Sequence, residues 1–154
     1  MEQELKKLLE ELCIKAYLSV TSIECEYEQD SKVLKFALQS DESNILIGKY
    51  GETLFALQQI FRLMASRSTE EELPHIILDV DGYRDNQVEN ALNIAKEFIR
   101  KMKATSLTSI DLPPMASYKR RAVHFYVVEN HPELNTDSTG FGAERRIVIS
   151  EKVS

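Results

Sequence analysis

The residues best suited to contact a charged ligand are two glycines flanking a lysine, in Ile47-Gly48-Lys49-Tyr50-Gly51. An apolar segment precedes them, and an amphipathic segment with helical spacing follows. Glycine has no Cβ, so its backbone can approach a bulky polar ligand closely. The N-terminus of the following helix directs its unpaired N–H groups and the positive end of its dipole to the same place. The pattern predicts a loop that could hold a sugar–phosphate backbone.

Two common nucleotide-binding loops fit these glycines less well. A P-loop needs a glycine five residues before Gly48 and a serine or threonine directly after Lys49, but Ser43 and Tyr50 occupy these positions. A dinucleotide-binding fingerprint needs a third glycine, and residues 55–57 supply none. A plain strand-to-helix turn, in which the glycines only relieve backbone strain, stays open as an alternative.

A second group of candidate ligand contacts is cationic. Arg120 and His124 are four positions apart, so on a helix they would point the same way, with Arg121 beside them. A guanidinium offers a planar fork to phosphate oxygens, and an imidazole can hydrogen-bond to a base or stack on it. Arg145 and Arg146 open the last predicted strand and could extend the patch. The alternative is a solvated cationic face without a ligand.

The remaining reactive side chains fit structural roles better than catalytic ones. Asp79 and Asp81 could hold a metal for phosphoryl transfer, but at the end of a strand we expect turn and helix-capping residues. Cys13 and Cys25 lie in apolar-patterned segments and are expected in the core. The histidines lack metal-ligand spacing, and no serine lies in a nucleophile elbow. We therefore expect no enzyme activity and no cofactor or metal.

Aromatic side chains could stack on bases. Tyr83, Phe125 and Tyr126 follow helical spacing and are expected in the core, because aromatic residues in that pattern usually pack inside. Phe141, between two glycines, is the candidate that remains.

The composition is typical of a cytoplasmic globular protein. No apolar run approaches the roughly 20 residues of a membrane span, so we expect no membrane insertion. Acidic residues precede the lysines at the N-terminus and no continuous apolar segment follows, which argues against a signal peptide. Two cysteines are too few for a disulfide framework and fit a reducing compartment.

The charge is unevenly distributed along the 154 residues. The net charge is −6, made of −7 (8 Lys/Arg against 15 Asp/Glu) over residues 1–80 and +1 (11 against 10) over residues 81–154. The cations of the second part cluster at residues 96–103, 119–121 and 145–146. A polyanion would therefore meet local basic patches on an acidic body, which predicts weak or selective binding.

Residue patterns predict two consecutive units of mixed helix and strand. In the first, we expect a helix at 3–17, strands at 17–28 and 32–38, a short helix from 41–44 to the glycine loop, a second helix after the loop, and a strand at 76–80. In the second, we expect a helix at 84–103, a strand at 106–112, a helix opened by Pro113-Pro114 and ending near 129, and strands near 133–138 and 145–150. The expected boundary lies between residues 81 and 82, without a flexible linker.

The motifs, in this order, resemble a known bacterial family. The element order and residues 47–58 resemble a type II KH domain, whose GXXG loop holds a few nucleotides of single-stranded RNA. Residues 114–124, then 137–140 and 145–149, resemble the Arg-x-x-x-His (R-3-H) domain that binds single-stranded nucleic acid. Together they resemble the Jag family (SpoIIIJ-associated protein, KhpB or EloR) over essentially the whole chain. Many members carry an additional N-terminal Jag-N domain, which we expect this chain to lack.

This resemblance implies an α+β fold: a type II KH domain (α-β-β-α-α-β) at 1–81 packed against a small α/β Arg-x-x-x-His domain at 82–154, with helices on a three-stranded sheet. It implies non-catalytic binding of single-stranded RNA linked to cell elongation, division or sporulation, with single-stranded DNA as a second ligand to test. The alternative is a protein-interaction adaptor that pairs with a small KH-domain protein or forms a homodimer, with little RNA affinity. The expected RNA-binding residues are Ile47, Gly48, Lys49, Tyr50, Gly51, Arg120, Arg121, His124, Arg145 and Arg146.

Overall fold

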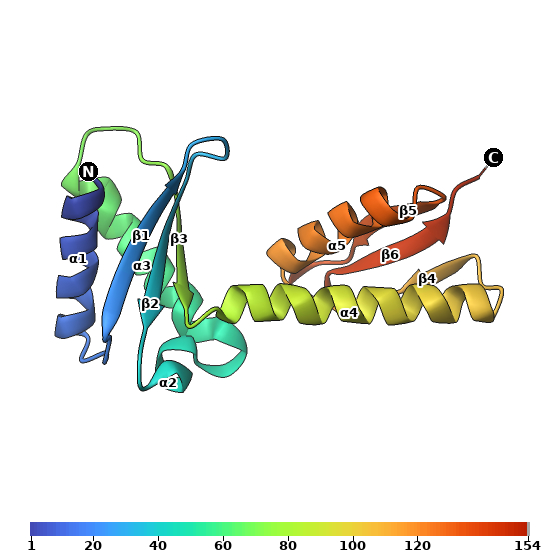
Figure 1. Ribbon diagram of the computed structural model, residues 1–154, viewed down its shortest axis with the longest axis horizontal. Coiled ribbons are helices and arrows are strands. Elements are labelled where there is room, and N and C mark those ends of the chain that lie inside the picture. Colours follow the sequence, from blue (N-terminus) through green and yellow to red (C-terminus); the bar gives the residue numbers. More distant parts are fainter. Residues whose placement is uncertain (154) are drawn as a thin grey trace. The chain divides into compact units, whose positions relative to one another are not determined.

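The computed structural model describes residues 1–153, and their contacts form two compact units (Figure 1). The first unit comprises Met1–Arg84 and the second begins at Asp85. The sequence predicts a boundary slightly earlier, between 81 and 82. Arg84 belongs with the first unit because its Nε donates a hydrogen bond to the Leu78 carbonyl, at 2.9 Å.

The first unit has the predicted α-β-β-α-α-β order. Its elements are α1 (Glu2–Lys15), β1 (Ser22–Glu28), β2 (Val33–Gln39), α2 (Ser43–Ile47), the 3₁₀ turn η1 (Lys49–Gly51), α3 (Glu52–Ser68) and β3 (His75–Val80). The strands form one sheet in the order β1-β2-β3, with β1 antiparallel and β3 parallel to β2. The core lies on one face of the sheet, because Leu34, Phe36 and Leu38 alternate along β2 and are fully buried. The Phe36 ring meets Phe61 of α3 edge-on, at 5.3 Å between centroids.

The strand expected at 17–28 begins later, at Ser22, because residues 16–18 close α1 instead of extending the strand. Tyr17 adopts a left-handed φ of 55°. Its N–H donates to the Ile14 carbonyl, and the N–H of Leu18 donates to the Cys13 carbonyl. These two bonds are the Schellman pattern that closes a helix, here with a tyrosine where glycine is usual.

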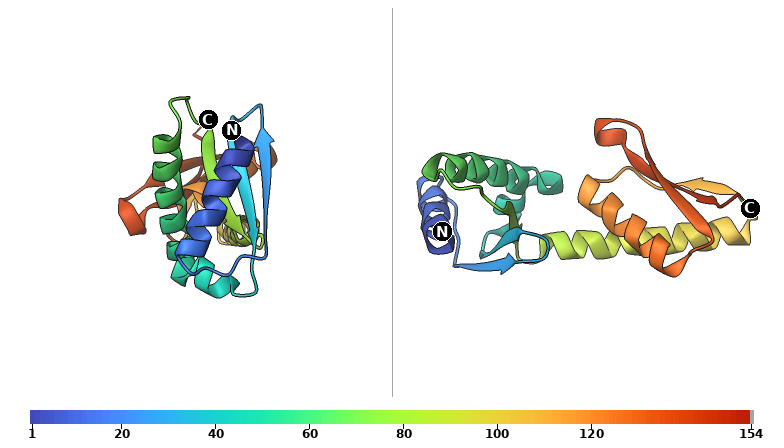
Figure 2. Two further views of the ribbon diagram at one scale, coloured as in Figure 1. Left: turned by 90° about the vertical axis from the view of Figure 1, so that its left-hand side faces the viewer. Right: turned by 90° about the horizontal axis from the view of Figure 1, so that it is seen from above.

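The second unit places two helices on a three-stranded sheet, as predicted. Its elements are α4 (Tyr83–Ala104), β4 (Ser109–Asp111), α5 (Ser117–Asn130), β5 (Leu134–Thr139), η2 (Gly142–Glu144) and β6 (Arg146–Glu151). The sheet is antiparallel, in the order β4-β6-β5. Figure 2 (right) shows α4 and α5 on the same side of this sheet. The side chains that join the layers are buried, among them Ala95 and Ile99 of α4, Val123 and Val127 of α5, and Ile147 and Ile149 of β6.

Two predicted bounds in the second unit were wrong. The helix expected to open at Pro113-Pro114 begins at Ser117. The residues before it run extended beside β6, where the N–H of Leu112 donates to Ile147 and the N–H of Met115 donates to Arg145. The strand expected at 106–112 is only Ser109–Asp111, because the residues before it complete the end of α4.

Two expectations from composition can be compared with the structure. Cys13 is buried in the first core, whereas Cys25 is half-buried against it. Burial raises the pKa of both thiols, so both resist ionisation at neutral pH. Within residues 1–153, no helix is both long and apolar enough to cross a bilayer.

Candidate nucleic-acid interface

The GXXG loop is held in an unusual backbone conformation. Gly48, Tyr50 and Gly51 have φ values of 71°, 56° and 80°, a region that favours glycine. Tyr50 is 80% exposed, and the Lys49 Nζ lies 5.4 Å from the centroid of its ring. The loop therefore presents a lysine and a tyrosine to solvent just before α3 begins.

The two glycines serve the packing of the protein itself. A Cβ on Gly48 would lie 2.8 Å from the Cβ of Thr53, and one on Gly51 would lie 3.0 Å from both the Phe55 and the Tyr83 rings. Gly51 is buried, and half-buried Ile47 packs against the first core. Of the five residues predicted here, Lys49 and Tyr50 are the two that are exposed to a ligand.

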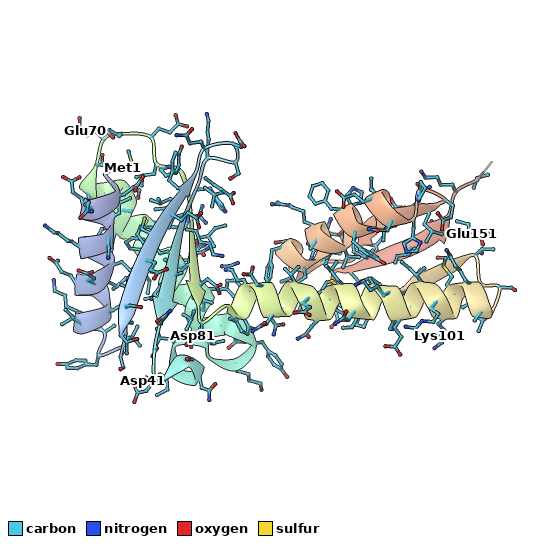
Figure 3. All side chains as sticks on the ribbon, in the orientation of Figure 1. Met1, Asp41, Glu70, Asp81, Lys101 and Glu151 are labelled. Carbon is cyan, nitrogen blue, oxygen red and sulfur yellow. The ribbon has the colours of Figure 1, made fainter. Side chains whose placement is uncertain are left out.

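Acidic side chains accompany the loop. Glu52 is the first residue of α3, and Figure 3 shows Asp41 and Asp81 at the end of the first unit that carries α2. The Ser43 hydroxyl on α2 donates to the Asp81 carboxylate. Lys49 thus lies in a segment, residues 1–80, whose net charge is −7, so the electrostatic attraction for a phosphate at this loop is weak.

Asp79 has the capping role expected of it. It is only 3% exposed, and its Oδ1 accepts hydrogen bonds from the N–H groups of Val80 and Arg84, both at 3.0 Å. The second bond satisfies a free N–H in the first turn of α4. Asp81 takes a turn conformation with φ of 48°. Within residues 1–153, no three His, Cys, Asp or Glu residues are placed to hold a metal ion.

The second unit contains a shallow cleft of about 320 Å³ between α5 and the β5–β6 hairpin. It brings together three of the predicted residues, from one helix. It also adds polar groups of β5 that the sequence did not single out, although their alternation along the strand places them on one face. The lining residues are Ser117, Arg120, Arg121, His124, Thr136, Ser138 and Ile147.

Hydrogen bonds hold the cleft side chains in place. The Arg120 Nη1 donates to the Met115 carbonyl at 2.6 Å, in the extended segment before α5. The His124 Nδ1 shares a hydrogen bond with the Thr136 hydroxyl across to β5. Burial and then the charge of Arg145 lower the pKa of Arg120, which stays a cation at neutral pH. The guanidinium groups of Arg120 and Arg121 thus line one small cleft, which favours a bound anion.

Arg145, just before β6, and Arg146, its first residue, have different partners. The Arg145 Nε donates to the Ser138 hydroxyl at 2.9 Å, and its Nη1 donates to the Gly140 carbonyl at 3.4 Å, so it borders the cleft. Arg146 instead pairs with the Glu144 carboxylate at 3.2 Å. Arg145 therefore joins the predicted cluster more closely than Arg146.

The prediction that Phe125 lies in the core was wrong. Its side chain is 58% exposed, because the buried stripe of α5 runs through Val123 and Val127 and turns Phe125 away. Phe141, retained as a candidate, is 90% exposed. Tyr126 is half-buried against the second core.

Comparisons with known proteins identify both units. The family model "KhpA/KhpB, KH domain" matches residues 2–77, and the R-3-H domain model matches residues 89–151. An RNA-binding protein KhpB of Clostridium symbiosum is 34% identical over 84% of this chain and 57% of its own length. RNA-binding proteins KhpB of Bacillus subtilis and Lactiplantibacillus plantarum are each 29% identical, over 81% and 71% of this chain.

The chain spans less than two thirds of each of these relatives: 57%, 60% and 33% of their lengths. The two domain models occur in the predicted order and cover both structural units. The chain therefore contains a KH domain of the KhpA/KhpB type followed by an R-3-H domain, and over most of its length it is similar to RNA-binding proteins KhpB.

Proposed function

We propose that this chain is a non-catalytic binder of single-stranded RNA whose main contact is the cleft of the second unit. The observation that carries the proposal is the convergence of Arg120, Arg121 and His124 on this cleft, with Arg145 at its border. The names of the relatives and the two domain families support nucleic acid as the ligand class. We also propose that the two units are separate domains, with the boundary close to residue 82.

Each cleft residue has a specific task in this proposal. Arg121 is exposed and meets a phosphate as a free cation. Arg120 is fixed through one nitrogen, so its remaining N–H groups are oriented before the ligand arrives. His124, Thr136 and Ser138 supply hydrogen bonds to sugar hydroxyls or base edges. Because hydrogen bonds already hold Arg120 and His124 in place, less conformational entropy is lost when the ligand binds.

The GXXG loop is a second and weaker contact. Lys49 provides one positive charge, and the exposed Tyr50 ring offers a surface to a base. Because acidic groups accompany the loop, it contributes less to affinity than the cleft does. We propose that it extends the bound strand rather than starting the encounter.

The adaptor alternative rests on the charge of the first unit. A balance of −7 over residues 1–80 suits a protein partner better than a polyanion. The family that includes KhpA and KhpB suggests a second KH protein as that partner, or a second copy of this chain. A role in cell elongation, division or sporulation is consistent with either an RNA binder or an adaptor.

Fluorescence anisotropy at about 50 mM salt tests the proposal with three labelled ligands of one sequence. The ligands are single-stranded RNA, the matching RNA duplex and single-stranded DNA. We expect single-stranded RNA to bind at least about tenfold more tightly than the duplex, because the duplex hides its base edges. Lys49→Gln should weaken binding less than Arg145→Gln does. Absence of RNA binding by the unmodified protein would favour the adaptor, which light scattering with and without a KH partner would then test.

A further inference from the structure

We propose that Phe125 and Phe141 are base-stacking residues that flank the arginine cleft, one on the helix and one on the hairpin. The proposal rests on the proposed function and adds to it how unpaired bases are recognised. Neither ring is part of a core, although both belong to the unit that contains the cleft.

Phe125 lies on the solvent face of α5, directly after a cleft residue. Its ring centroid is 5.9 Å from that of His124, with the two planes tilted by 54°. Val128, one turn further along, is 55% exposed and extends the apolar surface. Arg121 lies one turn before Phe125 on the same helix and is exposed. The outer face of α5 thus combines an aromatic platform with groups that bind phosphate.

Phe141 is carried on a turn braced by a cleft arginine. Its carbonyl accepts a hydrogen bond from the Glu144 N–H at 3.2 Å, and Arg145 donates to the carbonyl of the preceding Gly140. A Cβ on Gly140 would lie 3.0 Å from the Glu144 carbonyl oxygen, so the turn requires glycine there. The backbone is therefore fixed while the ring itself stays in solvent.

The surroundings of the rings favour nucleic acid over a protein partner. Arg121 lies four positions before Phe125 on α5, and Arg145 donates to the carbonyl of Gly140, the residue before Phe141. Aromatic rings interleaved with cations are how proteins hold single strands, with bases on the rings and phosphates on the cations. Stacking depends little on which base is present, so this surface predicts tolerance of sequence together with a strict need for bases.

Anisotropy with two labelled RNAs of equal length, a uridine oligomer and its abasic counterpart, separates stacking from phosphate contact. Each stacked base contributes at least about fivefold to affinity, so Phe125→Ala and Phe141→Ala should each weaken uridine binding by about that factor. The affinity for the abasic strand should change by less than about twofold, because its phosphates are unaltered. Leu107→Ala, at an apolar residue of the same unit that is 44% exposed, is the control.

A tryptophan reporter gives a second readout. The chain contains no tryptophan, so Phe125→Trp introduces a single indole. We expect this variant to keep its affinity and to lose fluorescence when the uridine oligomer binds, but not with the abasic strand. Unchanged uridine affinity in folded Phe125→Ala and Phe141→Ala variants would overturn the stacking and leave the rings to a protein contact. If Arg121→Gln still weakened binding, the proposed function would stand; an unmodified protein that binds neither strand would overturn both.

Discussion

Replacing Arg121 with glutamine removes one charge from the cleft with little effect on folding. Arg121 is exposed and lines the cleft from α5. If five predicted contact cations (Lys49, Arg120, Arg121, Arg145 and Arg146) each neutralise one phosphate, the logarithm of affinity falls with the logarithm of salt at a slope of roughly −3.5. Arg121→Gln should reduce this slope to about −2.8. Between about 50 and 200 mM salt, affinity would then fall about 50-fold rather than about 130-fold.

The assay is an anisotropy titration of single-stranded RNA at about four salt concentrations, with Lys101→Gln as the matched control. Lys101 is an exposed cation on the same unit, and Figure 3 shows it on the side of α4 away from α5. An unchanged slope in Arg121→Gln would remove Arg121 from the interface. Equal effects of the two variants would show that binding follows net charge and not the cleft.

Two further predictions concern stability and ionisation. Gly51→Ala should lower the free energy of unfolding by about 2–4 kcal/mol, because the new methyl group meets two aromatic rings at positive φ. Gly142→Ala, at positive φ but in open space, should lower the free energy of unfolding by only about 1 kcal/mol. Urea titration of the two variants measures both values. The Lys103 hydrogen bond lowers the pKa of Glu133 from 4.5 to about 2, so this pair stabilises the fold above pH 4.5 and the effect is lost as pH falls toward about 2. Lys103→Gln should return that pKa toward 4.5 in an NMR titration, and an unmoved pKa would refute the assignment.

Much of the fold is predictable from residue periodicity. Periodicity correctly predicted the strand at 32–38 and the helix at 84–103, which the structure has as β2 (Val33–Gln39) and α4 (Tyr83–Ala104). The errors occur where hydrogen bonds between distant segments decide the outcome. Pro113-Pro114 can open a helix, but β6 holds the neighbouring N–H groups in an extended connection. A local pattern carries no information about such a partner.

The candidate site is predictable in its charges and less so in its neighbours. The spacing of Arg120 and His124 correctly places them on one side of α5. Thr136 and Ser138 complete the cleft only because β5 lies beside that helix, which the spacing on α5 does not reveal. Gly51 shows the opposite case: the motif suggests close approach of a ligand, whereas the residue is buried against the Tyr83 ring.

The most direct test of the central claim is RNA binding by an Arg120→Gln/His124→Ala double variant. Both side chains line the cleft, and the variant leaves the first unit unchanged. Circular dichroism and a urea titration would establish that it folds. In anisotropy with single-stranded RNA at about 50 mM salt, we expect at least about tenfold weaker binding than in the unmodified protein. Equal affinity in the folded double variant would contradict the assignment of the cleft as the main RNA contact.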